Sequence, residues 1–233
     1  MNATVSLLAL VAFPAQAWAA DGDDWSGIYG GVHGTILAGD AEWSGTNIYE
    51  TLDGPEGSAV SNRQTIAAEV SKTRGGGGAR LGFNYQTGQL VLGIEGDVNF
   101  GGRTDIAALG GTTAPQAGYS LQTRSNILGT MRARAGIAFD RILLFGTGGL
   151  ALTNQRHTVT TGSGLSASAR NSSGWAGGGG AEFRLSDSLS IAATVLHVEL
   201  GLVNFAGSGG TDSFTTNVES SYTVGSVGLN LRF

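Results

Sequence analysis

The feature that most constrains the fold of this chain is a two-residue alternation of side-chain character in its last twelve residues. From Gly225 to Phe233 every second residue is apolar or small, and the residues between them are polar or small. A period of two is the spacing of a β-strand whose faces meet different surroundings. The apolar face ends on an aromatic residue, which favours a strand in lipid over the edge of a soluble sheet. Segment 222–233 therefore predicts a lipid-facing strand that pairs with a second strand and leaves no open edge.

Seven upstream segments carry the same alternation, and the connections between them sort by length. The connections alternate between long polar segments and very short turns, which is typical of outer-membrane barrels. We predict an all-β fold, an eight-stranded antiparallel up-and-down transmembrane β-barrel with long extracellular loops and short periplasmic turns. A soluble lipocalin-like barrel is the alternative, and it would place the apolar parity inside. The expected strands are 25–39, 79–86, 90–100, 121–139, 142–156, 172–185, 189–202 and 222–233. The expected loops are 40–73, with extended strand arms as the alternative there, 101–120, 157–171 and 203–219, and the expected turns are 87–88, 140–141 and 186–188.

Composition narrows the class of protein further. Charged residues make up only 13% of the chain, the formal net charge is −5, and 40 residues are glycine. A chain without a basic field is not expected to bind nucleic acid. The absence of cysteine removes disulfides and thiolate chemistry. The glycine runs 75–78 and 177–180 stay in phase with the alternation, so we interpret them as strand positions in a small barrel.

The N-terminus has the features of a targeting segment. An apolar run from Val5 to Phe13 is followed by small residues that end in an A-x-A pattern. We expect residues 1–20 to be a signal peptide cleaved near Ala19 or Ala20, although the segment lacks the usual Lys or Arg. The remaining residues, 21–233, are expected to form one barrel domain.

The polar parity of the strands places a set of ionisable side chains inside the barrel. If 87–88 is a two-residue turn, Arg80 stands directly opposite Glu95, which predicts an ion pair. Side chains fill the interior of an eight-stranded barrel, so we interpret the set as a structural plug, with a charge-selective constriction as the alternative. The predicted lumen residues are Arg80, Glu95, Asp97, Arg132, Arg134, Glu182, Arg184 and Arg232.

Aromatic residues near the strand ends are expected to anchor the barrel at the membrane interfaces. Trp43 is expected in the first long loop, and a β-bulge is expected near Val195, where the alternation blurs. No pair of the three histidines has metal-ligand spacing, so we expect no metal and no cofactor. The predicted interface aromatics are Trp25, Tyr85, Phe100, Trp175, Phe183 and Phe233.

Five blocks of the chain resemble the Omp25/Omp31-like outer-membrane proteins of alphaproteobacteria, which are barrels of the porin-opacity type. The blocks are WSGIYGGVHG (25–34), VLGIEGDVNF (91–100), MRARAGIAFDRILLFGTGGLALT (131–153), SGWAGGGGAEFRLSDSLSIAATVLHVELG (173–201) and VGLNLRF (227–233). The family usually carries a Lys and an acidic residue where this chain has Ala192 and Thr194, which implies a thinner lumen network there. The resemblance implies an abundant surface antigen with a role in envelope structure, and it implies no catalytic motif.

We therefore expect a non-enzymatic barrel protein of the Gram-negative outer membrane with an envelope-structural and surface-antigen role. A narrow porin-like channel for small solutes is the alternative, and the resemblance adds an adhesin or haem-binding protein. A lipid-acting enzyme would need a grouped Ser/His/acid set, and no G-x-S-x-G motif is present. The expected partners are outer-membrane lipid, lipopolysaccharide, the barrel assembly machinery through the C-terminal strand, and host or envelope molecules through the four loops.

Overall fold

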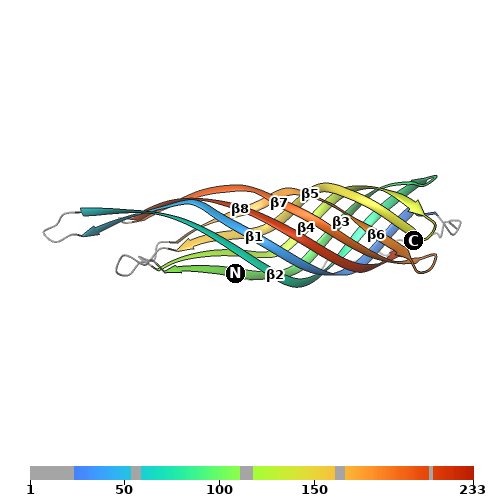
Figure 1. The fold of residues 1–233 in the computed structure, drawn as a ribbon, viewed down its shortest axis with the longest axis horizontal. Helices are drawn as coiled ribbons and strands as arrows, with labels where there is room; N and C mark the ends of the chain where they lie inside the picture. The colour runs from blue at the N-terminus through green and yellow to red at the C-terminus, as the bar shows by residue number, and fades with distance from the viewer. Residues whose placement is uncertain (1–23, 54–58, 111–117, 161–165, 210–211) are drawn as a thin grey trace, which may run out of the picture.

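The computed structural model describes residues 24–53, 59–110, 118–160, 166–209 and 212–233. The expected signal peptide, residues 1–20, lies outside the described residues. The described residues form eight antiparallel strands that pair in chain order and close into one barrel (Figure 1), so the predicted fold is confirmed. The strands are β1 (Gly27–Asp53), β2 (Ala59–Thr87), β3 (Leu90–Gly110), β4 (Gly118–Phe139), β5 (Ile142–Thr160), β6 (Ser166–Arg184), β7 (Leu189–Gly209) and β8 (Asp212–Arg232).

The barrel closes along the predicted seam between its first and last strands. Tyr29 stands opposite Arg232 and Ile36 stands opposite Gly225 in an antiparallel ladder between β1 and β8. Because this ladder satisfies the backbone groups of both strands, the sheet has no edge in the membrane. Among the described residues, no helix reaches the length and hydropathy that a membrane crossing requires.

The strands extend well beyond the expected segments. β5 has 19 residues and β2 has 29, whereas about 9–11 residues of a tilted strand cross the hydrocarbon layer. Most of 40–73, 101–120, 157–171 and 203–219 is therefore strand. The extended strand arms considered for 40–73 are confirmed, and the prediction of long loops at the other three segments was wrong. Strand pairing needs only backbone groups, and above the bilayer the outer face need not be apolar, so no alternation marks these strands. β1 and β2 project furthest, at the left of Figure 1.

The register shifts lie in the parts of the strands that are further from the periplasmic turns. They occur in several ladders, for example between Arg124 and Leu128 and between Leu200 and Val203. Such bulges are common at barrel rims, where they re-aim side chains. The bulge expected near Val195 was placed too early, because buried and exposed residues alternate regularly through that position.

The outer surface of the barrel carries a belt of exposed apolar side chains, as the parity predicted. Ile28, Val32 and Ile36 are exposed on β1, and equivalent residues follow on the other strands. The glycine runs 75–78 and 177–180 lie inside β2 and β6, so their interpretation as strand positions is confirmed.

Candidate functional site

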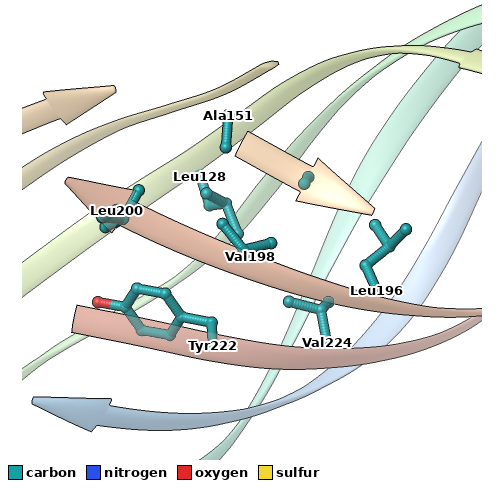
Figure 2. Packing of buried hydrophobic residues seen from close by; sticks show 8 residues of the cluster. Leu128, Ala151, Leu196, Val198, Leu200, Tyr222 and Val224 are labelled. Atoms are coloured by element: carbon teal, nitrogen blue, oxygen red, sulfur yellow. The ribbon is translucent and has the colours of Figure 1, made fainter. Parts of the chain in front are cut away.

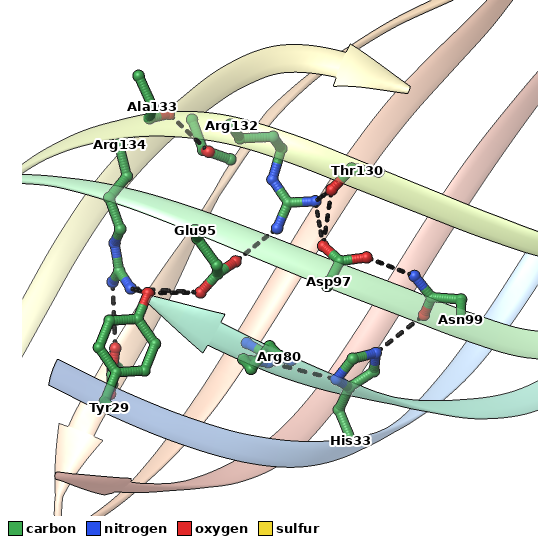
Figure 3. A network of polar contacts seen from close by, with 12 residues as sticks. Tyr29, His33, Arg80, Glu95, Asp97, Asn99, Thr130, Arg132, Ala133 and Arg134 are labelled. Carbon is green, nitrogen blue, oxygen red and sulfur yellow. Dashed lines mark hydrogen bonds and ion pairs between the residues drawn. The ribbon is translucent and has the colours of Figure 1, made fainter. Parts of the chain in front are cut away.

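The candidate site is the lumen, which side chains fill in successive layers. The first layer is ionic and lies between β3 and β4 (Figure 3). Glu95 stands opposite Arg132 in the ladder, and Arg132 Nη2 donates to Glu95 Oε1 at 2.5 Å. Arg132 Nη1 donates to Asp97 Oδ2, which also accepts from Thr130 Oγ1 at 2.8 Å. One guanidinium thus bridges two carboxylates. Arginine suits this role because its planar guanidinium carries several donors in fixed directions.

A second guanidinium, that of Arg134, connects this layer to residues on the other side of the lumen. Arg134 Nη1 donates to the Tyr29 hydroxyl at 2.7 Å, and the hydroxyl donates to Glu95 Oε2 at 2.7 Å. Arg134 Nη2 donates to Glu182 Oε2 at 3.1 Å, and the guanidinium carbon lies 3.9 Å from the centre of the Phe145 ring. Strands β1, β3, β4, β5 and β6 therefore meet at one cation.

Glu182 extends the same network to the last two strands. Its Oε1 accepts from Ser190 Oγ at 2.5 Å and from Asn230 Nδ2 at 2.9 Å. Ala192 and Thr194, where the resembling family carries charged residues, also face inward and are buried. On this side of the lumen, neutral donors from β7 and β8 satisfy the carboxylate.

The predicted pairing of Arg80 with Glu95 was wrong by two residues, because the turn lies one residue later than predicted. The turn consists of Gly88 and Gln89, so Arg80 stands opposite Asp97 and Gly82 stands opposite Glu95. Gly88 has a φ of 60°, the positive value that a type II′ hairpin requires at its first turn position.

The Arg80 side chain joins a branch of the network through a histidine. Arg80 Nε donates to His33 Nδ1 at 3.3 Å, and His33 Nε2 lies 2.8 Å from Asn99 Oδ1. A ring that accepts at Nδ1 and donates at Nε2 is neutral. Asn99 Nδ2 in turn donates to Asp97 Oδ1 at 2.6 Å, so this branch returns to the ionic layer.

The periplasmic end of the lumen is capped by Trp25, which is 0% exposed. Its prediction as an outward interface aromatic was wrong, because Trp25 precedes β1 and turns inward under two cations. The guanidinium carbons of Arg184 and Arg232 lie 4.5 and 5.1 Å from its ring centre, and both side chains donate to the Asp24 carbonyl. These two predicted lumen residues therefore lie in the cap.

Beyond the ionic layer, toward the long ends of the strands, the lumen is apolar. Figure 2 shows this cluster, in which Leu196, Val198 and Leu200 from β7 face side chains of other strands. The inward residues of β7 are apolar here, whereas its outward residues after Val195 are His197, Glu199 and Gly201. The apolar residues therefore change from the outer face to the inner face, which is why the alternation blurs in the sequence. The buried members are Leu128, Ala151, Ala176, Leu196, Val198, Leu200, Tyr222 and Val224.

Aromatic and polar side chains form a further layer beyond this cluster. Trp43, expected in a loop, lies in β1 with 1% exposure, and its ring meets His157 of β5 edge-on at 5.7 Å. β1 and β5 are on opposite sides of the barrel, so this contact spans its interior. Thr123 Oγ1 lies 3.1 Å from His157 Nδ1. Desolvation lowers the pKa of His157 to about 4 from its ordinary 6.5.

A cavity of about 20 Å³ lies beside Arg74, Asn99, Leu128 and Tyr222, which is room for about one water molecule. Within the described residues, no three His, Asp or Glu side chains come close enough to hold a metal ion. The geometry suits a packed plug.

The remaining predicted residues lie on the outer surface. Trp175 is half-exposed, and its ring lies 5.8 Å from that of His197, which also faces outward. The other predicted aromatics exposed there are Tyr85, Phe100, Phe183 and Phe233.

Several lumen residues were not singled out from the sequence. Tyr29, Asn99, Ser190 and Asn230 all take part in the network. Each has the inward parity of its strand, so parity could have included them. The predicted set held only charged residues, and these four side chains are neutral.

Residues 5–233 match the sequence profile described as outer membrane protein beta-barrel domain. The chain is 29% identical to a 31 kDa outer-membrane immunogenic protein of Brucella melitensis, over all of this chain and 95% of that protein. It is 25% identical to a 25 kDa outer-membrane immunogenic protein of Brucella abortus, over 55% of this chain and 53% of that protein. The crystal structure of Ail from Yersinia pestis, bound to sucrose octasulfate, is 14% identical, with a TM-score of 0.40 over 87% of this chain and 99% of Ail. The chain belongs to the outer-membrane β-barrel family of the Omp25/Omp31 type, and its location is the outer membrane of a Gram-negative bacterium.

Proposed function

We propose that this protein is a non-enzymatic, envelope-structural barrel and surface antigen whose lumen is plugged. The observation that carries the plug is the continuous network that crosses the lumen. It runs from Tyr29 on β1 through Glu95 and Arg134 to Glu182 on β6, and from there to Ser190 and Asn230. Buried ion pairs with their hydrogen bonds made are costly to separate, which keeps this cross-section occupied.

Single-channel recording in planar bilayers tests the plug. The purified, refolded mature protein is expected to give no stable conductance steps, whereas a wide trimeric porin reconstituted in the same way gives them. Refolding is verified in the same sample by far-ultraviolet circular dichroism. Stable, reproducible steps from the folded protein would contradict the plugged lumen.

A narrow channel is the second candidate, and one observation favours it. Two small inward residues on neighbouring strands, Thr147 on β5 and Gly178 on β6, keep accessible surface. If water followed this wall, Thr147→Trp would abolish a measurable solute flux into proteoliposomes. With a plugged lumen the wild-type flux is already at the level of protein-free liposomes.

The surface-antigen role is supported by the length of the strands and by the names of the relatives. The strands rise beyond the apolar belt as a barrel extension, with the β1–β2 hairpin furthest out. Both Brucella relatives carry the description immunogenic. Antibodies raised against the folded protein are expected to label intact cells, and labelling only after permeabilisation would contradict surface exposure.

The C-terminal strand supports a further part of the proposal, recognition by the barrel assembly machinery. β8 carries the apolar outward residues Val227, Leu229 and Leu231, and Phe233 follows them. Deletion of Phe233 is expected to lower the amount of protein recovered from the outer membrane. Unchanged recovery would contradict this recognition.

A further inference from the structure

The outer surface of the extension carries three arginines in one row. Arg124 on β4 stands opposite Arg156 on β5, and Arg156 stands opposite Arg170 on β6. All three side chains are exposed. Directly paired side chains on neighbouring strands lie about 5 Å apart at Cβ, where like charges destabilise the sheet. Such a row is stabilised when an anion lies against it.

The three guanidinium groups have no anionic partner in the part of the chain that the structure describes. The ion pairs found there join lumen residues, and the acidic side chains on the outer surface gather elsewhere. Asp40, Glu42 and Glu219 are exposed on β1 and β8, and Glu42 stands opposite Glu219. β1 lies across the barrel from β5, so the cationic and acidic faces point in opposite directions.

The arginine row lies just above the apolar belt. Each arginine lies within five residues of the last large apolar residue on the outer face of its strand, which is Ile127, Leu152 or Trp175. A strand rises about 3.3 Å per residue and tilts by roughly 40°, so the row begins within about 13 Å of the hydrocarbon boundary. The flexible arginine stems reach back toward that boundary. This level is that of the lipid headgroups.

A neutral polar row follows the arginines on the same three strands. Gln122 stands opposite Thr158, and Thr158 stands opposite Ser168. From the membrane outward, the face of β4, β5 and β6 therefore presents apolar groups, then three cations, then hydroxyl and amide groups. This order matches acyl chains, phosphates and sugar hydroxyls in an amphipathic, phosphorylated glycolipid.

We propose that the face formed by Arg124, Arg156 and Arg170 binds the phosphorylated headgroup of the outer-leaflet glycolipid, lipopolysaccharide. Guanidinium groups donate paired hydrogen bonds to phosphate oxygens, and three in a row span more than one phosphate. Binding would fix the rotational orientation of the barrel relative to its lipid neighbours. The inference depends on the outer-membrane location and is independent of whether the lumen is plugged.

The test measures binding of lipid A to the folded, full-length mature protein in detergent micelles. The triple variant Arg124→Gln/Arg156→Gln/Arg170→Gln is expected to bind lipid A at least tenfold more weakly than wild type. The matched control, Asp40→Asn/Glu42→Gln/Glu219→Gln, changes three outward charges on the opposite face and is expected to bind at least as tightly as wild type. Wild type is expected to bind enzymatically dephosphorylated lipid A at least tenfold more weakly.

Three results would overturn the proposal. They are equal binding by wild type and the arginine variant, an equal loss in the acidic-face control, and equal binding of dephosphorylated lipid A. A further arm separates another ligand of similar charge. Displacement of lipid A by an equal concentration of inorganic phosphate would assign the row to the free ion. Because the changed side chains are all exposed, every variant is expected to fold. Thermal unfolding of each variant verifies this.

Discussion

At the scale of single residues, the lumen depends on a few cations that each satisfy several anions or dipoles. Arg134 contacts Tyr29, Glu95, Glu182 and the Phe145 ring, so no other single side chain can replace it. Removal of one partner from a buried ion pair leaves an uncompensated charge, which costs more than the pair contributes. If Arg134 were removed, the neutral donors Ser190 and Asn230 would still stabilise the charge of Glu182.

Arg134→Ala is expected to lower the free energy of unfolding by about 3–5 kcal/mol, because Glu95 and Glu182 then share one cation fewer. Guanidinium unfolding of the refolded protein in detergent measures the change. The control Arg141→Ala, at an exposed turn, is expected to stay within about 0.5 kcal/mol of wild type. Adding Glu182→Gln to Arg134→Ala is expected to recover part of the loss, and no recovery would contradict the coupling of these two residues.

His157 is expected to make the extension sensitive to acid. Its folded-state pKa of about 4 lies below the ordinary 6.5, so the unfolded chain binds the proton first. The neutral ring stabilises the fold above pH 6.5, and this stability is lost as pH falls from 6.5 toward 4, by up to roughly 3 kcal/mol. Amide hydrogen exchange in the outer part of β4 and β5 is expected to accelerate at pH 4.5.

The His157→Gln variant removes the titrating group and is expected to lose this acceleration. His197→Gln is the matched control, because His197 is exposed on the outer surface and its removal should leave the acceleration intact. If His157→Gln kept the pH dependence of wild type, another group would be responsible.

At the scale of strands, inward glycines allow the sheet to coil tightly. A Cβ placed on Gly178 of β6 would lie 2.1 Å from the Val195 carbonyl oxygen on β7, and backbone atoms of a paired strand cannot move aside. On the outer face of β1, a Cβ on Gly34 would meet nothing within 4 Å. The same residue type therefore has different roles on the two faces of the barrel wall.

Gly178→Ala is expected to destabilise the barrel by about 1–3 kcal/mol, since the strands must separate to admit the methyl group. Gly34→Ala is expected to be neutral or to stabilise it by a few tenths of a kcal/mol, because it restricts only the unfolded chain. Urea unfolding of both proteins refolded in the same detergent measures the difference. Equal effects at the two positions would show that backbone crowding at Gly178 is relieved locally.

At the scale of the whole molecule, the proposed plug consists of several layers. The Trp25 cap, the ionic layer, the apolar cluster and the contact between Trp43 and His157 follow one another along the axis. In the proposed plug, closure therefore depends on the stack of layers and not on one gate.

Trp25→Ala is therefore expected to leave the protein non-conducting in planar bilayers, although the cap has lost its largest side chain. The cation–π contacts of Arg184 and Arg232 are lost, so a lower melting temperature is expected in the same preparation. Stable conductance steps from Trp25→Ala would mean that the cap alone closes the lumen.

The alternation of side chains determined the strand order, the lipid-facing residues and the seam between 25–39 and 222–233, because a wall between lipid and lumen imposes a period of two. Tertiary structure decided the turn register, the burial of two tryptophans and the facing of two arginines, none of which a two-residue period specifies. The turn at Gly88 and Gln89 set which side chain faces Arg80, since one shifted turn residue moves a whole ladder. Trp25 and Trp43 are buried in the lumen because they pack against side chains of distant strands. The register shifts at the rim turned Arg124 and Arg170 outward, away from the parity of the lumen arginines on the same strands, because a bulge reverses the facing of every residue beyond it.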